Sequence, residues 1–248
     1  MRSARLSIRS YAAASQATIN ASPSIPMPLW KRVADVTFCV IALPIVGLVT
    51  LGMATLMTVV SPGPVFFHQE RVGYLGRRFK IYKFRTMHVG ADTGIHRAHT
   101  EFLMGSNAPM MKMDNRGDSR LIPCGALIRA SGLDELPQLI NVLLGDMSLI
   151  RPRPCVPYEY DKYLAWQRER FSTLPGLTGL WQVSGKNRTT FEEMIRLDIH
   201  YAHHKSLPLD LKIVLLTPFA LIQQVLDTRR DKKRAVQATR TVATDLVS

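Results

Sequence analysis

The sequence has 248 residues and a hydrophobic share of 46%, which allows one well-buried core and excludes both a disordered chain and a protein that crosses a membrane many times. Its formal net charge of +13 at pH 7 indicates a negatively charged partner: a nucleic acid, an anionic lipid or a phosphorylated substrate. Cys39, Cys124 and Cys155 fit no metal-binding or redox spacing, so we interpret them as free thiols in a reducing compartment.

The first 27 residues are rich in serine and alanine, carry Arg2, Arg5 and Arg9, and contain no acidic residue. This composition is also found in organelle transit peptides, but the segment lacks the compact apolar stretch of a secretory signal. We therefore predict that residues 1–27 form a disordered basic arm.

An uncharged stretch runs from Val36 to Val60, and its 25 residues are enough to cross a hydrocarbon core about 30 Å thick as a helix. Pro44 removes a backbone donor and predicts a kink. Basic residues lie on both sides of the stretch, and the positive-inside tendency places both flanks in the cytoplasm. These residues are Arg2, Arg5, Arg9, Lys31 and Arg32 before it, and Arg71, Arg77, Arg78, Lys80, Lys83 and Arg85 after it. The pattern predicts a re-entrant helix hairpin over residues 28–62, with a straight crossing as the alternative.

The next region, residues 63–226, is predicted to be a single mixed α/β domain that is rich in helix. Ser61-Pro-Gly-Pro64 is a strong breaker, and residues 71–87 indicate two short strands joined by a turn. Residues 90–120 are polar and predict a loop with a short helix near His99–Met104. The basic segment 227–248 is expected to be a loose tail.

A helix is predicted over Asp134–Leu144, because leucine and isoleucine recur there at steps of three and four residues. Asp134 is suited to the N-cap, Pro137 to the first turn, and Gly145 to the end of this helix. An acidic pair, Asp134 and Glu135, therefore lies at a helix start.

Two more helical segments follow. Thr190 and Glu193 have the spacing of a capping box, which predicts a helix that continues toward His204. Leu209–Leu226 is apolar but short, and we expect it to lie in the membrane interface as an amphipathic helix.

The pair Asp134–Glu135 is the main candidate for chemistry. A carboxylate at a helix start can attack phosphorus, and its neighbour can hold a divalent cation that offsets phosphate charge. The alternative is that both residues only cap the helix.

Basic residues around this pair favour a diphosphate site. Arg129 precedes the pair by five residues, and Arg153 follows the helix in a proline-stiffened loop. The planar fork of arginine matches phosphate oxygens. Lys83 and Arg85 are further candidates, although a solvated basic face explains them equally well.

Several ordered blocks resemble the monotopic phosphoglycosyl transferases, often called bacterial sugar transferases, of the exopolysaccharide type. The resemblance extends from about Lys31 to Leu226. The blocks are Lys31-Arg32 with Asp35, Ser61-Pro-Gly-Pro-Val-Phe-Phe-His-Gln-Glu-Arg-Val-Gly73, Lys83-Phe-Arg-Thr-Met87, Leu133-Asp-Glu-Leu-Pro-Gln-Leu-Ile-Asn-Val-Leu143, Gly145-Asp-Met-Ser-Leu149, Pro152-Arg-Pro154 and Pro175-Gly-Leu-Thr-Gly-Leu-Trp-Gln-Val-Ser-Gly185.

The resemblance implies a small catalytic domain on a kinked re-entrant helix, located at the cytoplasmic face of the bacterial inner membrane. It implies Asp134 as nucleophile, Glu135 as ligand of Mg²⁺, and Arg129 and Arg153 as phosphate-binding residues. The implied reaction moves a hexose 1-phosphate from a UDP-hexose to a polyprenol phosphate such as undecaprenyl phosphate. It passes through an aspartyl-phosphosugar, releases UMP and starts an exopolysaccharide or related glycan.

One residue departs from the family pattern, because Arg151 stands where the family usually has a glycine before Pro-Arg-Pro. A glycine there serves a positive φ or a close approach, whereas Arg151 either adds a phosphate contact or slows the enzyme. Two rival functions stay open: a membrane glycosyltransferase that releases UDP, and a non-enzymatic protein that binds anionic lipid. Nucleic acid is not expected as a partner, because no known binding module surrounds the basic and aromatic stretch Phe79–Phe84.

Overall fold

The computed structural model describes residues 27–92, 94–106, 108–110 and 118–245, with side chains up to Arg230. Apart from Met27, the predicted basic arm lies outside the described residues. The α-helices are α2 (Leu29–Val60), α3 (Gly94–Gly105), α4 (Gly125–Ser131), α5 (Leu139–Leu144), α6 (Pro157–Lys162), α7 (Leu180–Val183), α8 (Phe191–His204) and α9 (Leu207–Asp245). The 3-10 helices are η2 (Tyr74–Gly76), η4 (Leu133–Gln138), η5 (Trp166–Ser172) and η6 (Lys186–Arg188), and the strands are β1 (Phe66–Val72), β2 (Arg78–Phe84), β3 (Ser148–Ile150) and β4 (Gly176–Thr178).

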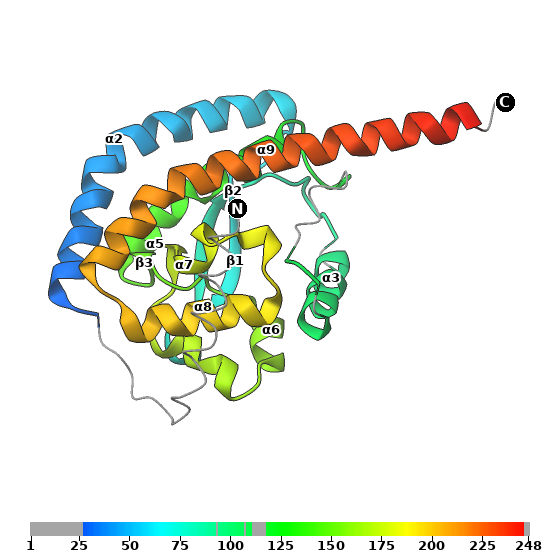
Figure 1. Cartoon of the computed structure of the whole chain (residues 1–248). Helices are drawn as coiled ribbons and strands as arrows, with labels where there is room; N and C mark the ends of the chain where they lie inside the picture. The colour runs from blue at the N-terminus through cyan, green and yellow to red at the C-terminus, as the bar shows by residue number, and fades with distance from the viewer. Residues whose placement is uncertain (1–26, 93, 107, 111–117, 246–248) are drawn as a thin grey trace.

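Two small sheets lie under the helices α2 and α9, which run along one side of the molecule (Figure 1). β1 and β2 pair antiparallel, with Phe66 opposite Phe84 and Val72 opposite Arg78. β3 and β4 pair in parallel. The prediction of a helix-rich mixed α/β chain is confirmed, and so are two strands joined by a turn, although β1 begins earlier than expected. The short helix predicted near His99–Met104 is the longer helix α3.

Helix α2 contacts the rest of the protein along one stripe. Its buried residues are Lys31, Asp35, Cys39, Met53 and Met57, and they recur at steps that keep them on one face. Its remaining surface exposes large apolar side chains. These include Phe38, Ile41, Ile45, Leu48 and Leu51. A helix that is apolar all round and buried on one stripe only is typical of a membrane environment.

Both ends of α2 are held by the same domain. Near its start, Lys31 Nζ lies 2.5 Å from Asp210 Oδ2 of α9, and both side chains are buried. After its end, Arg85, the residue that follows β2, donates from Nη1 to Ser61 Oγ (2.9 Å) and from Nε to the Pro64 carbonyl (2.7 Å). The helix continues through Pro44 without interruption and is visibly bent along its length (Figure 1). The bend is present, whereas a reversal into two separate helices is not.

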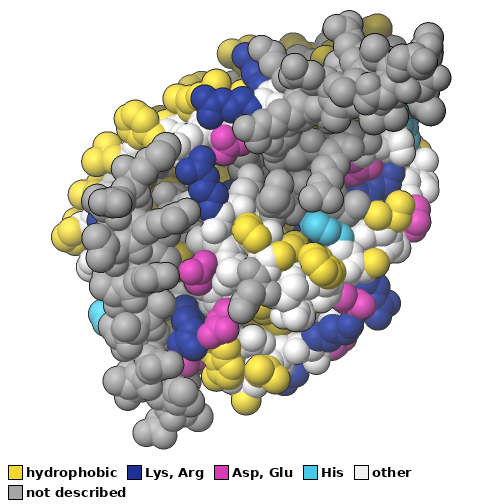
Figure 2. Space-filling model, turned by 45° about the vertical axis from the view of Figure 1, so that its right-hand side comes forward, with side chains coloured by type: hydrophobic (Ala, Val, Ile, Leu, Met, Phe, Trp, Pro, Cys, Tyr) yellow, Lys and Arg dark blue, Asp and Glu magenta, His cyan; other side chains and the backbone are white. Residues whose placement is uncertain are grey.

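Helix α9 is longer than the sequence indicated. It runs without interruption across Asp227, the predicted start of the tail, so the segment up to Asp245 is helical rather than loose. Within the described residues, Leu29–Val60 and Leu207–Arg230 are both long and apolar enough to cross a membrane. Apolar side chains gather along the upper left edge of the molecule in Figure 2, while acidic and basic ones are interspersed below.

Helix α8 supplies the centre of the largest core cluster. Its capping box is present as predicted, because Glu193 N donates to Thr190 Oγ1 and Thr190 N donates to the Glu193 side chain. Ile195 and Tyr201 of this helix are fully or almost fully buried. This core fixes the loops that carry the candidate site.

Arg85→Met is expected to lower the thermal stability of the protein, because Ser61 and Pro64 would lose charge-assisted hydrogen bonds in a buried position. A net loss of about 2–3 kcal/mol corresponds to a fall in Tm of about 5–10 °C for a chain of this size. Calorimetry of the full chain in nanodiscs measures this shift. Arg78→Met is the matched control, because Arg78 is 59% exposed and lies 3.3 Å from Glu70. An Arg85 variant as stable as this control would contradict the anchoring role.

Candidate active site

The acidic pair lies in the 3-10 helix η4, directly after a glycine in the left-handed conformation. Gly132 has φ 76° and is the residue before η4, and Asp134 and Glu135 occupy the first turn. The single α-helix predicted over Asp134–Leu144 is therefore wrong in its first half, and Asp134 is not its N-cap. Pro137 lacks a backbone donor, and the chain becomes α-helical only from Leu139. Gly145 ends the helix as predicted, with φ 92°.

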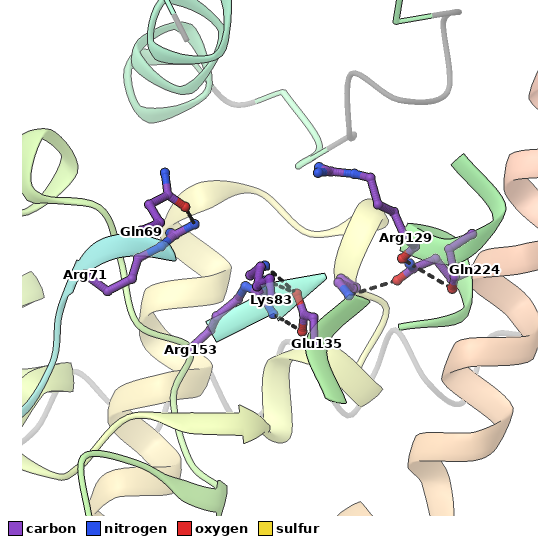
Figure 3. A network of polar contacts seen from close by, with 9 residues as sticks. Gln69, Arg71, Lys83, Arg129, Glu135, Arg153 and Gln224 are labelled. Atoms are coloured by element: carbon purple, nitrogen blue, oxygen red, sulfur yellow. Dashed lines mark hydrogen bonds and ion pairs between the residues drawn. The ribbon is translucent and has the colours of Figure 1, made fainter. Parts of the chain in front are cut away.

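The Glu135 carboxylate lies between two cations from other parts of the chain. Lys83 Nζ of β2 lies 3.0 Å from Glu135 Oε1. Arg153 donates from Nη1 to Oε2 (2.8 Å) and from Nη2 to Oε1, which is the bidentate fork that arginine makes with a carboxylate. Figure 3 shows the ends of both cationic side chains at the Glu135 carboxylate. The structure thus brings together Glu135, Lys83 and Arg153, which the sequence proposed separately.

Neighbouring groups hold Arg153 in place. Arg170 donates to the Arg153 carbonyl (2.8 Å) and forms a buried ion pair with Asp198 of α8. Arg170 also donates to Tyr163 Oη at 2.9 Å. The loop that carries Arg153 is therefore fixed to the core by a charged residue that is itself paired with Asp198.

The pKa values of the cluster follow from burial and charge. Burial raises the pKa of Glu135, but the charges of Arg153 and Lys83 outweigh it and hold this pKa well below its usual range. Burial lowers the pKa of Lys83 to about 8, although the Glu135 carboxylate opposes the change. For Arg153, burial lowers the pKa and the Glu135 carboxylate more than compensates, so the net direction is upward. At neutral pH Glu135 is therefore ionised.

Asp134 lies beside this cluster and is only 3% exposed. Its negative charge raises the pKa values of both Lys83 and Arg153, which places its carboxylate within electrostatic reach of both cations. Two adjacent carboxylates, one almost fully buried and one held by cations, are thus the centre of the site.

Two predicted phosphate-binding residues lie elsewhere. Arg85 is directed to Ser61 and Pro64 behind the end of α2, so its guanidinium is used to hold that turn. Arg129 is on α4, and its side chain extends above Glu135 in Figure 3, into the space between α4 and the side where Arg71 lies. Burial, followed by the charges of Arg71 and Arg129, lowers the pKa of His96 to about 4. Arg129 therefore lies within electrostatic reach of His96 on α3, as Arg71 does.

Arg71 is a candidate that the sequence did not single out. It lies on β1, donates from Nη2 to Gln69 Oε1 (2.6 Å), and acts electrostatically on Lys83. Burial lowers the pKa of Arg71, and the charges of Glu159 and Glu135 oppose this while Arg153 adds to it. The only sequence signal was its position in the block Gln69-Glu-Arg-Val-Gly73, and nothing in that block distinguishes Arg71 from the other basic residues nearby.

Arg151 is not a phosphate contact. Its side chain has 0% exposure, and the charges that act on it come from Tyr201, Asp210 and Asp35 rather than from Glu135. Its φ is not positive, so the backbone conformation does not require glycine. The close approach at this place is made by Gly176 and Gly179, where a Cβ would lie 2.2 Å from Arg151 N and 2.4 Å from Arg151 O.

The carboxylate pair has oxygen donors of the kind that a magnesium ion takes. No group of three or more His, Cys, Asp or Glu residues gathers among the described residues. Mg²⁺ commonly takes one or two protein carboxylates and completes its octahedron with waters and substrate phosphates. Asp134 and Glu135 supply such a donor set, and Glu135 retains lone pairs beyond those that Lys83 and Arg153 use.

Comparison with known proteins gives a consistent set of relatives. Residues 27–224 match the model of the family described as "Bacterial sugar transferase". The chain is 41% identical over 188 residues to the galactosyl transferase CpsE of Streptococcus agalactiae serotype III, which covers 75% of this chain and 41% of that protein. It is 38% identical over 208 residues to a UDP-glucose:undecaprenyl-phosphate glucose-1-phosphate transferase of Caulobacter vibrioides, covering 81% and 72%. It is 35% identical over 191 residues to the exopolysaccharide production protein ExoY of Sinorhizobium fredii, covering 75% and 83%. The chain thus spans less than half the length of the streptococcal relative.

The ionisation of Lys83 offers a direct measurement of the cluster. Acylation of Lys83 by a small amine reagent, followed by peptide mass spectrometry across pH, should give a midpoint at a pKa of about 8. Glu135→Gln should move this midpoint lower, because the Glu135 charge favours the protonated amine. Lys162, which is 46% exposed and outside the cluster, is the internal control whose profile should not change. An unchanged Lys83 midpoint in the variant would contradict the ion pair.

Proposed function

The chain belongs to the bacterial sugar transferase family, and on that basis we propose that it transfers a hexose 1-phosphate from a UDP-sugar to a polyprenol phosphate. The transfer releases UMP and starts an exopolysaccharide or related glycan. The observation that carries the proposal is the adjacent pair of a buried Asp134 and a Glu135 held by Lys83 and Arg153. Relatives that bear names of sugar-phosphate transferases to undecaprenyl phosphate support the same reaction class.

In the first step, an Asp134 carboxylate oxygen attacks the β-phosphorus of the UDP-hexose. The bond between that phosphorus and the oxygen bridging to the α-phosphate breaks, UMP leaves with the electron pair, and the phosphosugar stays on Asp134. Lys83 and Arg153 stabilise the charge that accumulates on the phosphoryl oxygens, because both cations lie beside the carboxylate pair.

In the second step, a phosphate oxygen of the polyprenol phosphate attacks the same phosphorus and frees the Asp134 carboxylate. Asp134 is 3% exposed, so little water reaches the acyl phosphate between the two steps. A water-soluble donor and a lipid acceptor can thus use one nucleophile in turn.

A divalent cation fits this scheme. Glu135, with Asp134 beside it, would hold Mg²⁺, which would offset the negative charge of the diphosphate and polarise its phosphoryl oxygens. Lys83 and Arg153 keep Glu135 ionised and fix its orientation for that purpose.

The proposed location is the cytoplasmic face of the bacterial inner membrane, with α2 as a re-entrant helix. Support comes from the two ends of α2, because Lys31 and Ser61 are both bound by one domain. A straight helix of 32 residues spans about 48 Å and would carry one end across a hydrocarbon core about 30 Å thick. The bend of α2 (Figure 1) supports the proposal, because a re-entrant helix must turn back within the membrane.

The test uses the full chain with undecaprenyl phosphate vesicles and a panel of UDP-hexoses, starting with UDP-glucose and UDP-galactose, and identifies the nucleotide released. UMP supports the proposal, whereas UDP would indicate a glycosyltransferase. No nucleotide release with any donor would leave a protein that only binds anionic lipid.

Asp134→Asn is expected to leave less than about 1% of the transfer rate, because an amide cannot form the acyl phosphate and covalent catalysis contributes several kcal/mol. Glu135→Gln is also expected to be severe and to recover partly when the magnesium concentration is raised. Both variants are measured by UMP release. Residual turnover of Asp134→Asn well above this level would refute the nucleophile, and a Glu135→Gln rate equal to wild type at every magnesium concentration would refute the cation site.

Topology has its own test. Single cysteines at Ser3 and Arg77, in a chain without Cys39, Cys124 and Cys155, should both be protected from membrane-impermeant thiol reagents in intact cells and both react after lysis. The reason is that a re-entrant α2 leaves its two flanks in the cytoplasm. Labelling of one position but not the other in intact cells would establish a true crossing.

A further inference from the structure

Arg151 has an unusual position for an arginine, because its whole side chain is buried. It is 0% exposed, and none of its three guanidinium nitrogens donates a hydrogen bond to another described residue. A buried charge costs several kcal/mol unless opposite charges lie nearby. The charged groups around Arg151 therefore determine how its burial is compensated.

The groups around Arg151 come from three helices. Tyr201 of α8, Asp210 of α9 and Asp35 of α2 are the groups that oppose the lowering of its pKa by burial, and of these the two aspartates carry negative charge. Tyr201 Oη lies 2.6 Å from Asp210 Oδ1 and 2.9 Å from the carbonyl of Ile150, the residue before Arg151.

The buried part of the cluster is balanced in charge. Lys31 lies 2.5 Å from Asp210, and Leu149 N donates to Asp35 Oδ1 at 3.3 Å. The other oxygen of Asp35 is buried and has no hydrogen-bond partner among the described residues. Within the buried part of the cluster, Lys31 and Arg151 supply two positive charges and Asp35 and Asp210 supply two negative ones. Lys205 lies at its partly exposed edge, where burial and then the charges of Arg151 and Lys31 lower its pKa to about 8. Removal of a buried member therefore leaves one of the buried groups uncompensated.

The main chain of Arg151 is fixed from the other side. Its N–H donates to the Thr178 carbonyl of the β3–β4 pair at 2.8 Å. Gly176 and Gly179 pack so closely on it that no side chain fits between them. Two residues later comes Arg153, which forks onto Glu135. Arg151 thus lies between the bases of α2 and α9 and the loop that carries Arg153.

We propose that Arg151 is a positioning residue that ties the bases of the membrane helices α2 and α9 to the Pro-Arg-Pro loop and so aligns Arg153 with Glu135. The expected loss of kcat/KM rests on the proposed transferase function, whereas the expected loss of thermal stability does not. Arg151 itself touches no substrate, since its side chain is buried away from the carboxylate pair.

The experiment is a double-mutant cycle in the full chain in nanodiscs, with Arg151→Met, Asp35→Asn and the double variant. Tm and the kcat/KM for UMP release are both measured, the latter well below each Tm. Each single variant leaves an unbalanced buried charge, so Tm should fall by about 10 °C, and the double variant should recover at least half of that loss. Arg151→Met should lower kcat/KM by about tenfold or more, comparable to losing one charge-assisted contact of Arg153.

Ile195→Ala is the control for stability alone, because Ile195 is fully buried in the core on α8 and outside the site. It should lower Tm by a similar amount and leave kcat/KM within about twofold of wild type. Arg151→Lys, which keeps the charge, should retain more activity than Arg151→Met. Equal kcat/KM losses in Arg151→Met and Ile195→Ala, or additive Tm losses in the cycle, would overturn the proposal. A wild type that releases no UMP would instead refute the transferase function, and the Tm cycle would still decide whether Arg151 and Asp35 are coupled.

Discussion

The ion pairs of Glu135 are the interaction on which the site depends, because they join three segments that are far apart in the sequence. Lys83 comes from a strand of the first sheet, Glu135 from η4, and Arg153 from the loop after β3. Neither cation can move far without leaving a partly buried carboxylate uncompensated. The same contacts keep Glu135 ionised and fix its own orientation, so its charge state and its geometry have one cause.

The membrane-facing helices reverse the usual arrangement of polar and apolar surface. Lys31 and Asp35 are on the inner stripe of α2, while large apolar side chains face outward. In water this distribution would expose an apolar patch far larger than soluble monomers tolerate. In a bilayer the outer surface is matched to lipid, and the inner charges are satisfied by partners on the domain, such as Asp210 for Lys31.

The sequence predicted a helix-rich mixed α/β fold and several element ends, because these depend on local patterns. The capping box of Thr190 and the end of α5 at Gly145 follow from short-range backbone chemistry, and the structure confirms them. The start of the Asp134 helix was wrong because Gly132 and Pro137 impose a 3-10 turn, which periodicity of apolar residues does not reveal. Arginine roles were the least predictable. Arg85 and Arg151 carry the same side chain as Arg153. Their neighbours in three dimensions determine that Arg85 binds Ser61 and that Arg151 is buried among helices, so neither contacts Glu135.

The contact of Arg32 with α5 has a consequence for how the protein matures. Arg32, at the base of α2, donates to the carbonyls of Val142 and Leu143 (2.8 Å for the latter), which belong to the last turn of the helix that follows the acidic pair. The Val142 carbonyl also accepts from Gly145 N at 3.2 Å, whereas the Leu143 carbonyl is in the last turn, where the helix itself offers no donor, and in apolar surroundings an unmet carbonyl is costly. The helix behind Asp134 therefore becomes fully hydrogen-bonded only after α2 has docked. The end of the helix behind the acidic pair is thus completed by the same helix that carries the apolar outer surface, so docking of α2 and formation of that helix end are linked.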